Sequence, residues 1–469
     1  MNKVTPIIRL AGPVSAILTA ALGRFQPQYW LLGIALWMLI WWITETVHLG
    51  VTALLPLVLF PALEIAEAKS LATYYAHPLV YLFFGGFVLA LALEKTGLHY
   101  RIALWILRKT GTKDHQLLAG FMLATAFMSM WISNTATAIM MLPIASSVIA
   151  ILEPEQRDKL ARPILLSVAW AANIGGMATL IGTPPNMIFA GFMSAQLNRQ
   201  IGFVEWLPVG LSASALLGTI AYLILRRGLG HNELSSSEEE RTRNWLKDEW
   251  SRLGTLTTAQ RRVAMVFALT AMFWILRPYL NIWIPVIQWS DTGIALAAAV
   301  ILFAVFDGSD KSVLDWGDTK ALPWGILLLF GGGLALAGTL QASQWFVMLG
   351  DQLQSLQGIP FATWLLVMAL LGVFATELLS NMALVSALLP LVYSLATALG
   401  LDFYALSLPL VLGASCAFML PVATPPNLIV YGSNLFKVNQ MIKAGFALNI
   451  LGLILVTLIA LTLVPYFLG

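Results

Sequence analysis

The chain has 469 residues, of which 59% are hydrophobic and 10% charged, and its formal net charge is +3. Its mean hydropathy is +0.82, whereas soluble domains carry about 25% charged residues, so the composition excludes a soluble globular protein and predicts an all-α polytopic membrane protein. The single cysteine, Cys416, excludes a disulfide framework and any cysteine-based metal site.

The first residues have a basic end and a short apolar run, which is also the pattern of a secretory signal peptide. Because further apolar segments follow directly, we interpret this run as a first transmembrane helix and assign residues 1–75 to N-terminal scaffold helices. A helix needs about 20 apolar residues to cross the hydrocarbon core. The predicted spans lie near residues 10–24, 29–46, 50–63, 79–94, 163–197, 208–226, 263–281, 292–306, 322–342, 405–435 and 444–467.

Lys and Arg gather at residues 95–113, at residues 157–162 and in the hydrophilic segment 227–262. By the positive-inside rule these segments face the cytoplasm, and the loops that are poor in basic residues face out. The crossings then place the N-terminus in the cytoplasm and the C-terminus outside. Residues 227–262 are interpreted as a cytoplasmic linker, amphipathic or partly disordered, and the short loops are typical of a bacterial inner membrane protein.

Two further apolar stretches do not fit this pattern of single crossings. Residues 116–152 lie between two basic loops, so the chain returns to its starting side, either through two tight crossings or through a re-entrant hairpin centred on Ser-Asn-Thr at 133–135. Residues 361–399 show the same pattern between two out-facing loops, centred on Ser-Asn-Met at 380–382. We therefore predict about eleven transmembrane helices plus two re-entrant hairpins that enter from opposite faces.

Matching motifs recur in the same order in the two halves of the chain. The pairs are LFFGGFVLALAL from Leu82 with LLFGGGLALAGT from Leu328, SNTATAIMMLP from Ser133 with SNMALVSALLP from Ser380, and GTPPNMI from Gly182 with ATPPNLI from Ala423. Together with the opposite entry of the hairpins, they predict an inverted-topology repeat, whose sites form at the midplane. The first repeat would span residues 76–230, with hairpin 116–152 and a broken helix at 163–197. Residues 263–469 would hold the remaining helices and the second repeat, with hairpin 361–399 and a broken helix at 405–435.

Each half also has two consecutive prolines inside an apolar span, at 184–185 and at 425–426. Proline lacks an amide donor and clashes with the preceding turn, so each span must break into two half-helices. Unpaired backbone at this depth is tolerated where it lines a cavity or binds a ligand. The tips and breaks offer Ser, Asn and Thr oxygens, free carbonyls and helix N-termini, but no Lys or Arg. Neutral oxygens suit Na⁺ and helix N-termini suit an anion, which predicts cation-coupled anion transport.

The segments SMWISNTATAIMMLPIA, IGGMATLIGTPPN, TELLSNMA and CAFMLPVATPPNLIVYGS resemble the signatures of the divalent anion/sodium symporter (DASS) family. The resemblance covers nearly the whole chain. It implies a transporter, not an enzyme, that couples the entry of at least two Na⁺ ions to uptake of a C4-dicarboxylate such as succinate, malate or fumarate. It also implies a homodimer with an elevator motion. The expected partners are the dianion, sodium ions and membrane lipid, with no nucleic acid.

The resemblance also implies, by position, a set of binding residues in the tips and breaks. The first Na⁺ site would use Ser129, Ser133, Asn134 and the backbone at Gly182. The second would use Thr376, Ser380, Asn381 and the backbone at Ala423. The substrate would contact Ser133, Asn134, Thr135, Thr183, Ser380, Asn381 and Thr424, with Pro425 at the edge. Met382 departs from the family's second Ser-Asn-Thr and has no hydroxyl; a lost hydrogen bond to a charged group is worth about 1.5–3 kcal/mol, so the departure bears on which dianion binds.

Other functions are compatible with parts of this pattern. A Na⁺-independent dicarboxylate exchanger, or a sulfate or citrate carrier, would use the same fold. An intramembrane serine protease needs a general base beside the serine, and no apolar core segment carries a suitably placed His. An anion channel leaves two symmetric cation sites unexplained. We interpret Glu45 and Glu377 as structural or field-setting carboxylates, with proton coupling through Glu377 as the alternative, and Glu205 as a solvated surface residue.

Overall fold

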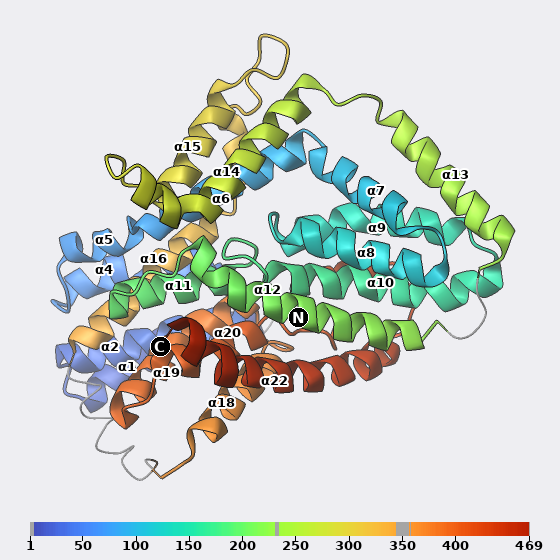
Figure 1. The fold of residues 1–469 in the computed structure, drawn as a ribbon. Helices are drawn as coiled ribbons and strands as arrows, with labels where there is room; N and C mark the ends of the chain where they lie inside the picture. Colours follow the sequence, from blue (N-terminus) through green and yellow to red (C-terminus); the bar gives the residue numbers. More distant parts are fainter. Residues whose placement is uncertain (1–3, 230–233, 344–355, 357, 469) are drawn as a thin grey trace.

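The structure is a computed structural model that describes residues 4–229, 234–343, 356 and 358–468. The described residues form helices and short connections, with one isolated bridge between Phe306 and Ser312 (Figure 1). The predicted all-helical class is therefore confirmed. The helices of the first half are α1 (Val4–Leu22), α2 (Pro27–Thr44), α3 (Leu49–Thr52), α4 (Leu55–Ala62), α5 (Ala68–Tyr75), α6 (Pro78–Lys95), α7 (Leu98–Thr110), α8 (Asp114–Ser129), α9 (Asn134–Ile151), α10 (Pro154–Gly176), α11 (Pro184–Leu197) and α12 (Phe203–Arg227).

The second half of the chain begins with a polar helix. Its elements are α13 (Ser236–Arg252), α14 (Thr258–Trp283), α15 (Asp291–Ala304), the 3-10 helix η1 (Trp316–Ala321), α16 (Trp324–Ala342), α18 (Phe361–Leu370), the π-helix η3 (Leu371–Ala375), α19 (Asn381–Leu399), α20 (Phe403–Gly413), α21 (Pro425–Tyr431) and α22 (Val438–Leu468).

Within the described ranges, 7 helical segments are long and apolar enough to cross a membrane. They are Ala68–Lys95, Asn134–Ile151, Phe203–Arg227, Thr258–Trp283, Trp324–Ala342, Asn381–Leu399 and Val438–Thr462. Several of the expected spans are instead divided into shorter helices. The span expected at 50–63 is interrupted between α3 and α4, and proline stands in the first turn of α4, α11 and α21. Proline has no amide hydrogen for a continuous helix, but it suits the first turn of a new one.

The amphipathic helix α7 packs against the polar helix α13, outside the predicted spans. The Arg101 guanidinium of α7 is buried and donates hydrogen bonds to the carbonyls of Leu253 at 2.7 Å and Gly254 at 2.9 Å, directly after α13. Arg101 and Arg108 both lie over the Trp250 ring. Sequence reasoning missed α7, and it left open whether the linker is amphipathic or disordered; the described part of the linker is a helix fixed by these contacts.

A helix–turn–helix unit and a broken helix follow one another in each half. In the first half, α8 ends at Ser129 and α9 begins at Asn134, while α10 ends at Gly176 and the chain resumes helix only at Pro184. In the second half, α18 continues into a π-helix before the turn that leads to α19. The gap between α20 and α21 runs over residues 414–424. The turns and gaps leave backbone groups without intrahelical partners.

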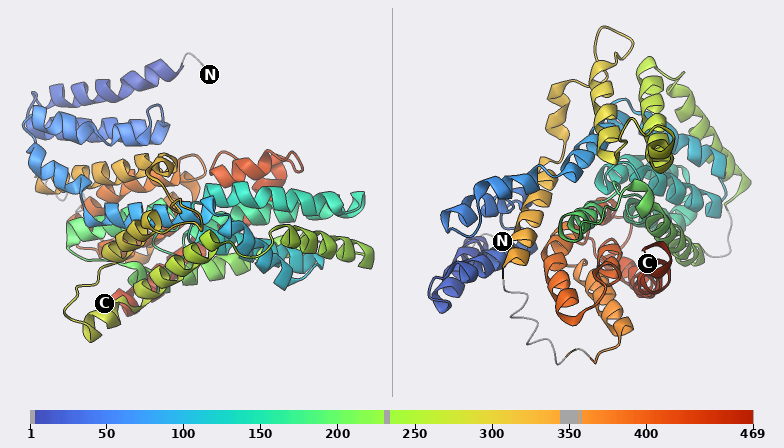
Figure 2. Two further views of the ribbon diagram at one scale, coloured as in Figure 1. Left: turned by 90° about the horizontal axis from the view of Figure 1, so that it is seen from above. Right: turned by 60° about the vertical axis from the view of Figure 1, so that its left-hand side comes forward.

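The hairpin of each half packs on the broken helix of the other half. Helix α9 contacts α10 of its own half and α21 of the second half, and α19 contacts α20 and, across the halves, α11. In Figure 2 the N-terminal helices α1 and α2 lie together at the edge of the molecule. The turns and the breaks from both halves are thereby brought to one region.

Candidate functional site

The Ser129 hydroxyl, next to the first turn, contacts two oxygen atoms from other segments. This buried hydroxyl lies 2.7 Å from Asn134 Oδ1 and 2.6 Å from the carbonyl oxygen of Ala172. The Ser133 hydroxyl caps α9 by accepting a hydrogen bond from the Ala136 amide at 3.2 Å. A hydroxyl, an amide oxygen and a backbone carbonyl from three segments therefore meet at the end of α8.

The second turn repeats this arrangement with Thr376 in place of the serine. The Thr376 hydroxyl lies 2.7 Å from Asn381 Oδ1 and 2.8 Å from the Ala414 carbonyl oxygen. The Ser380 hydroxyl accepts from the Ala383 amide at 3.3 Å and caps α19. The same three kinds of oxygen meet at corresponding positions of the two halves, so the duplication seen in the sequence is also a duplication of contacts.

The two breaks are held by asparagines that sequence reasoning left out of the site. The amide nitrogen of Asn186 donates to three carbonyls among residues 176–179, the shortest contact being 2.9 Å to Thr179. Asn427 does the same in the second half, with 3.0 Å to the carbonyls of both Ala417 and Leu420. Each is the last residue of a Thr-Pro-Pro-Asn motif, so the paired motif was a usable signal. By satisfying carbonyls that a broken helix leaves free, these side chains fix the shape of each gap.

Asn173 connects the first turn to the second break, and no matching asparagine in the other half marked it in advance. Its Oδ1 accepts from Asn134 Nδ2 at 3.5 Å, while its Nδ2 donates to the Thr424 hydroxyl at 3.1 Å and to the Ala417 carbonyl at 3.2 Å. The side chain is fully buried on α10. Two of the expected binding residues from opposite halves, Asn134 and Thr424, are thus joined through one amide.

The remaining expected residues differ in how deeply they lie. Gly182 and Ala423 are buried beside the breaks, and a Cβ at Gly182 would stand 2.5 Å from the Gly176 carbonyl oxygen. Thr183 and Thr424 each immediately precede a new helix, and Thr424 also accepts from the Asn427 amide at 3.4 Å. Thr135 is half-buried and Pro425 is exposed. The structure therefore links Ser129 with Asn134 and Thr376 with Asn381 directly, whereas Thr135 and Pro425 are the less buried of the expected residues in this group.

Glu377 stabilises the second break through backbone amides. Its Oε1 accepts hydrogen bonds from the amides of Phe418 at 2.8 Å and Met419 at 2.9 Å, and its Oε2 accepts from Leu420 at 2.9 Å. Asn449 of α22 donates to the same Oε1 at 2.7 Å, and both side chains are buried. All four contacts come from donors on the second break and on α22, so the side chain ties these two segments together. This arrangement favours the structural interpretation of Glu377.

In the first half, the turn and the break are joined by a neutral hydrogen bond and not by a carboxylate. There the Thr179 hydroxyl, inside the break, donates to the Met130 carbonyl at 2.6 Å. Among the residues that the structure describes, no group of three His, Cys, Asp or Glu side chains could hold a metal ion. The two halves therefore share neutral oxygen contacts, and only the second carries a buried negative charge next to its turn.

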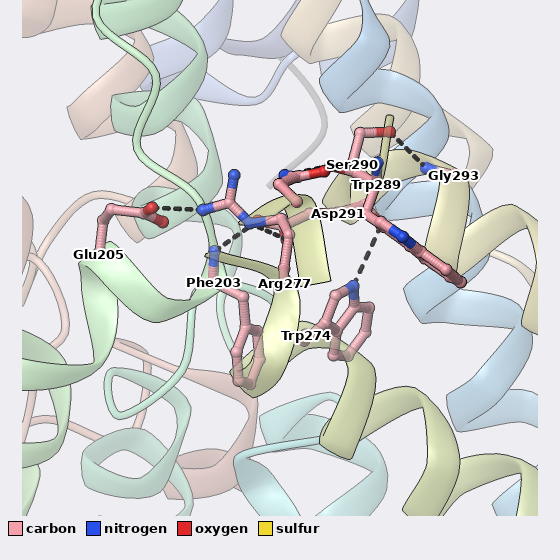
Figure 3. A network of polar contacts seen from close by, with 9 residues as sticks. Phe203, Glu205, Trp274, Arg277, Trp289, Ser290, Asp291 and Gly293 are labelled. Carbon is pink, nitrogen blue, oxygen red and sulfur yellow. Dashed lines mark hydrogen bonds and ion pairs between the residues drawn. The ribbon is translucent and has the colours of Figure 1, made fainter. Parts of the chain in front are cut away.

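A separate ion-pair network ties the start of α12 to α14 and α15 (Figure 3). Arg277 forms an ion pair with Asp291 at 2.9 Å through Nε and another with Glu205. Asp291 is buried and also accepts from the Phe203 amide at 2.8 Å. A Cβ at Gly202 would collide with the Asp291 carboxylate, so glycine permits this approach. Glu205 was expected to be a solvated surface residue; its side chain is 37% exposed, but its carboxylate forms an ion pair with Arg277, on a helix distant in sequence.

Paired helical turns and paired helix breaks, brought together in an apolar helical protein, are features of the repeat-built class of membrane transporters. The chain matches, over residues 7–467, the family described as the sodium:sulfate symporter transmembrane region, and it belongs to that family. This confirms the family suggested by the motifs, a multi-pass membrane protein, and a transporter function in place of an enzymatic one.

Relatives and a solved structure agree with this assignment. The sodium-dependent dicarboxylate transporter SdcS of Staphylococcus saprophyticus is 34% identical over 478 residues, covering 98% of this chain and 91% of that protein. SdcS of Staphylococcus aureus (strain MW2) is 34% identical over 476 residues, with 98% and 91% covered. The crystal structure of the Alcanivorax borkumensis YdaH transporter aligns with a TM-score of 0.57 and 14% identity, covering 88% of this chain and 98% of that one. At that identity the likeness bears on the fold alone.

Proposed function

We propose that the protein is a sodium-coupled symporter that takes up a small divalent anion, in the first place a C4-dicarboxylate such as succinate, malate or fumarate. The observation that carries the proposal is the duplicated oxygen cluster at Ser129 and at Thr376, each with an asparagine oxygen and a backbone carbonyl within 2.8 Å of the hydroxyl. Such neutral oxygens replace the water around Na⁺ without a fixed charge. The two Staphylococcus relatives are sodium-dependent dicarboxylate transporters, which supports a dicarboxylate as the anion.

The proposed ligands follow from the same positions. One Na⁺ ion would bind Ser129, Ser133, Asn134 and the backbone at Gly182, and a second would bind Thr376, Ser380, Asn381 and the backbone at Ala423. The dianion would lie between the two turns, at Ser133, Asn134, Thr135, Thr183, Ser380, Asn381, Thr424 and Pro425. The N-terminal ends of α9 and α19 add partial positive charge there. Bound sodium ions supply the remaining positive charge, which explains an anion site without lysine or arginine.

The proposed topology is an inverted repeat of about eleven spans and two re-entrant hairpins, with the N-terminus in the cytoplasm and the C-terminus outside. The first repeat would cover residues 76–230 and the second would lie within residues 263–469, joined by the cytoplasmic linker 227–262. Transport would proceed by an elevator motion within a homodimer in a bacterial inner membrane. The packing of each hairpin on the broken helix of the other half supports movement of these elements as one body.

Proteoliposomes that hold the purified protein should take up labelled succinate when an inward Na⁺ gradient is imposed, and not when an equal K⁺ gradient is imposed. Asn134→Ala and Asn381→Ala should each lower uptake at least about tenfold, because each removes an oxygen from a proposed Na⁺ site and a donor from the anion site. Uptake that requires internal succinate but no Na⁺ would identify an exchanger. Uptake of sulfate or citrate in place of succinate would show that the substrate is not a C4-dicarboxylate.

Met382 is expected to limit how tightly one end of the dianion is held. Met382→Thr restores a hydroxyl beside Asn381, so it should lower the KM for succinate by about 10-fold, in line with about 1.5–3 kcal/mol for a hydrogen bond to a charged group. Met382→Val, which is β-branched like threonine but has no hydroxyl, is the matched control and should leave the KM near the parent value. An equal gain with valine would assign the effect to side-chain volume.

A further inference from the structure

A cavity of about 430 Å³ lies between α10, α12 and α22, away from the turns and breaks. Its polar lining comes from Arg162, Gln440 and Lys443, and its apolar walls include Pro163, Leu225 and Ala444. Helix α12 packs against both α10 and α22, and the three helices run beside one another in Figure 1. Arg162 stands 11 residues before Asn173 on α10, which at 1.5 Å per residue puts the cavity about 16 Å from the proposed transport site along that helix.

The three helices that form this cavity change from polar to apolar at the same level. On α10, the polar segment that begins at Pro154 ends at Arg162, and the apolar run starts at Pro163. On α12, the apolar run ends at Leu225 and is followed by two arginines. On α22, the last cation before the apolar run is Lys443. Because all three boundaries meet at one cavity, the cavity lies at the boundary between hydrocarbon and water, where lipid headgroups lie.

The cations of this cavity have no carboxylate partner in the part of the chain that the structure describes. No hydrogen bond or salt bridge of Arg162 or Lys443 is present there, although Asp158 stands one helical turn before Arg162. Arg162 is half-buried, so its charge is partly shielded from water. Gln440 uses its Oε1 to accept from the Lys437 amide at 2.9 Å, which leaves its amide hydrogens as donors at the cavity. The cavity therefore presents two cations and one donor above apolar walls.

We infer that this cavity binds the phosphate of an anionic phospholipid, with Arg162 and Lys443 as the phosphate ligands. A phosphodiester carries one negative charge and several acceptor oxygens, which guanidinium and ammonium groups recognise. The apolar walls at Pro163, Leu225 and Ala444 would contact the glycerol and the first acyl carbons. Basic pockets between transmembrane helices on the cytoplasmic side are suited to such headgroups. The site stabilises the assembly of α10, α12 and α22 at their cytoplasmic ends.

The test is a thermal-shift titration of the full-length protein in an uncharged detergent, with short-chain phosphatidylglycerol as the probe. Phosphatidylglycerol should raise the Tm in a saturable manner, and phosphatidylcholine with the same chains should not. Arg162→Gln with Lys443→Gln should weaken the apparent affinity for phosphatidylglycerol at least about tenfold, because two charged contacts are lost. Arg243→Gln with Lys247→Gln is the matched control, since both cations are exposed on α13 outside the cavity.

A second variant tests the space in the cavity while keeping its charges. Ala444→Trp fills the cavity and keeps both cations, so it should also weaken binding at least about tenfold, and it decides the question if the double glutamine variant does not fold. Inorganic phosphate or glycerol 3-phosphate acting as well as phosphatidylglycerol would overturn a lipid as the source. Equal shifts with phosphatidylcholine, or an equal loss in the α13 control, would overturn the site.

Discussion

Replacing Glu377 with alanine is expected to abolish transport and to destabilise the protein by several kcal/mol. The change leaves the amides of residues 418–420 and the Asn449 side chain without their acceptor. A buried donor without a partner costs about 1–3 kcal/mol, and a typical domain is stable by only about 5–15 kcal/mol in total. Thermal unfolding followed by tryptophan fluorescence, together with uptake in proteoliposomes, measures both effects.

Glu377→Gln tests the effect of the negative charge separately from the effect on folding. Glutamine keeps the volume and one acceptor, but its NH₂ group would face the amide donor of Leu420. We expect a folded protein that is less stable by about 1.5–3 kcal/mol, the worth of one charged hydrogen bond, and whose apparent Na⁺ affinity is reduced because the negative charge beside Thr376 is lost. Glu45→Gln is the control, since Glu45 is exposed at the end of α2. An unchanged Na⁺ dependence in Glu377→Gln would show that the carboxylate acts only through packing.

Asn173→Leu is expected to reduce transport more than any other single change on α10. Leucine has a similar volume, but it removes the contacts to Asn134, Thr424 and the Ala417 carbonyl, so the first turn is no longer tied to the second break. The lost hydrogen bonds should lower stability by about 1–3 kcal/mol. Uptake should fall at least about tenfold, with the KM for Na⁺ and for the dianion both raised, because each proposed site loses a neighbour that fixes its geometry.

Ser167→Ala on the same helix provides the comparison. Ser167 is fully buried, but its hydroxyl donates only to the Ile164 carbonyl of its own helix at 2.7 Å. This variant should leave both KM values unchanged and should cost no more than about 1 kcal/mol of stability. If Ser167→Ala impairs transport as much as Asn173→Leu does, the effect of Asn173 belongs to the packing of α10 and not to a link between the halves.

Much of the site could be anticipated because its residues occur twice. The pairs Ser129 with Asn134 and Thr376 with Asn381 stand in matching motifs, and the structure joins each pair through a hydroxyl. Asn186 and Asn427 were visible in the same motifs, but only their contacts with the breaks show that they hold the backbone. Asn173 has no such duplicate, so neither periodicity nor composition distinguishes it from a residue that merely packs within a helix.

Hydropathy and proline chemistry act on neighbouring residues, so the amino-acid sequence was enough to predict a helical protein that is apolar enough for a membrane and interrupted at its paired prolines. Which groups meet across the halves became visible only in the folded protein. Asn173 reaches Thr424, Glu377 reaches Asn449, and Arg277 reaches Glu205 and Asp291. These contacts join segments far apart in the chain, and a buried polar group takes as its partner whichever donor or acceptor the packing of the helices brings within reach.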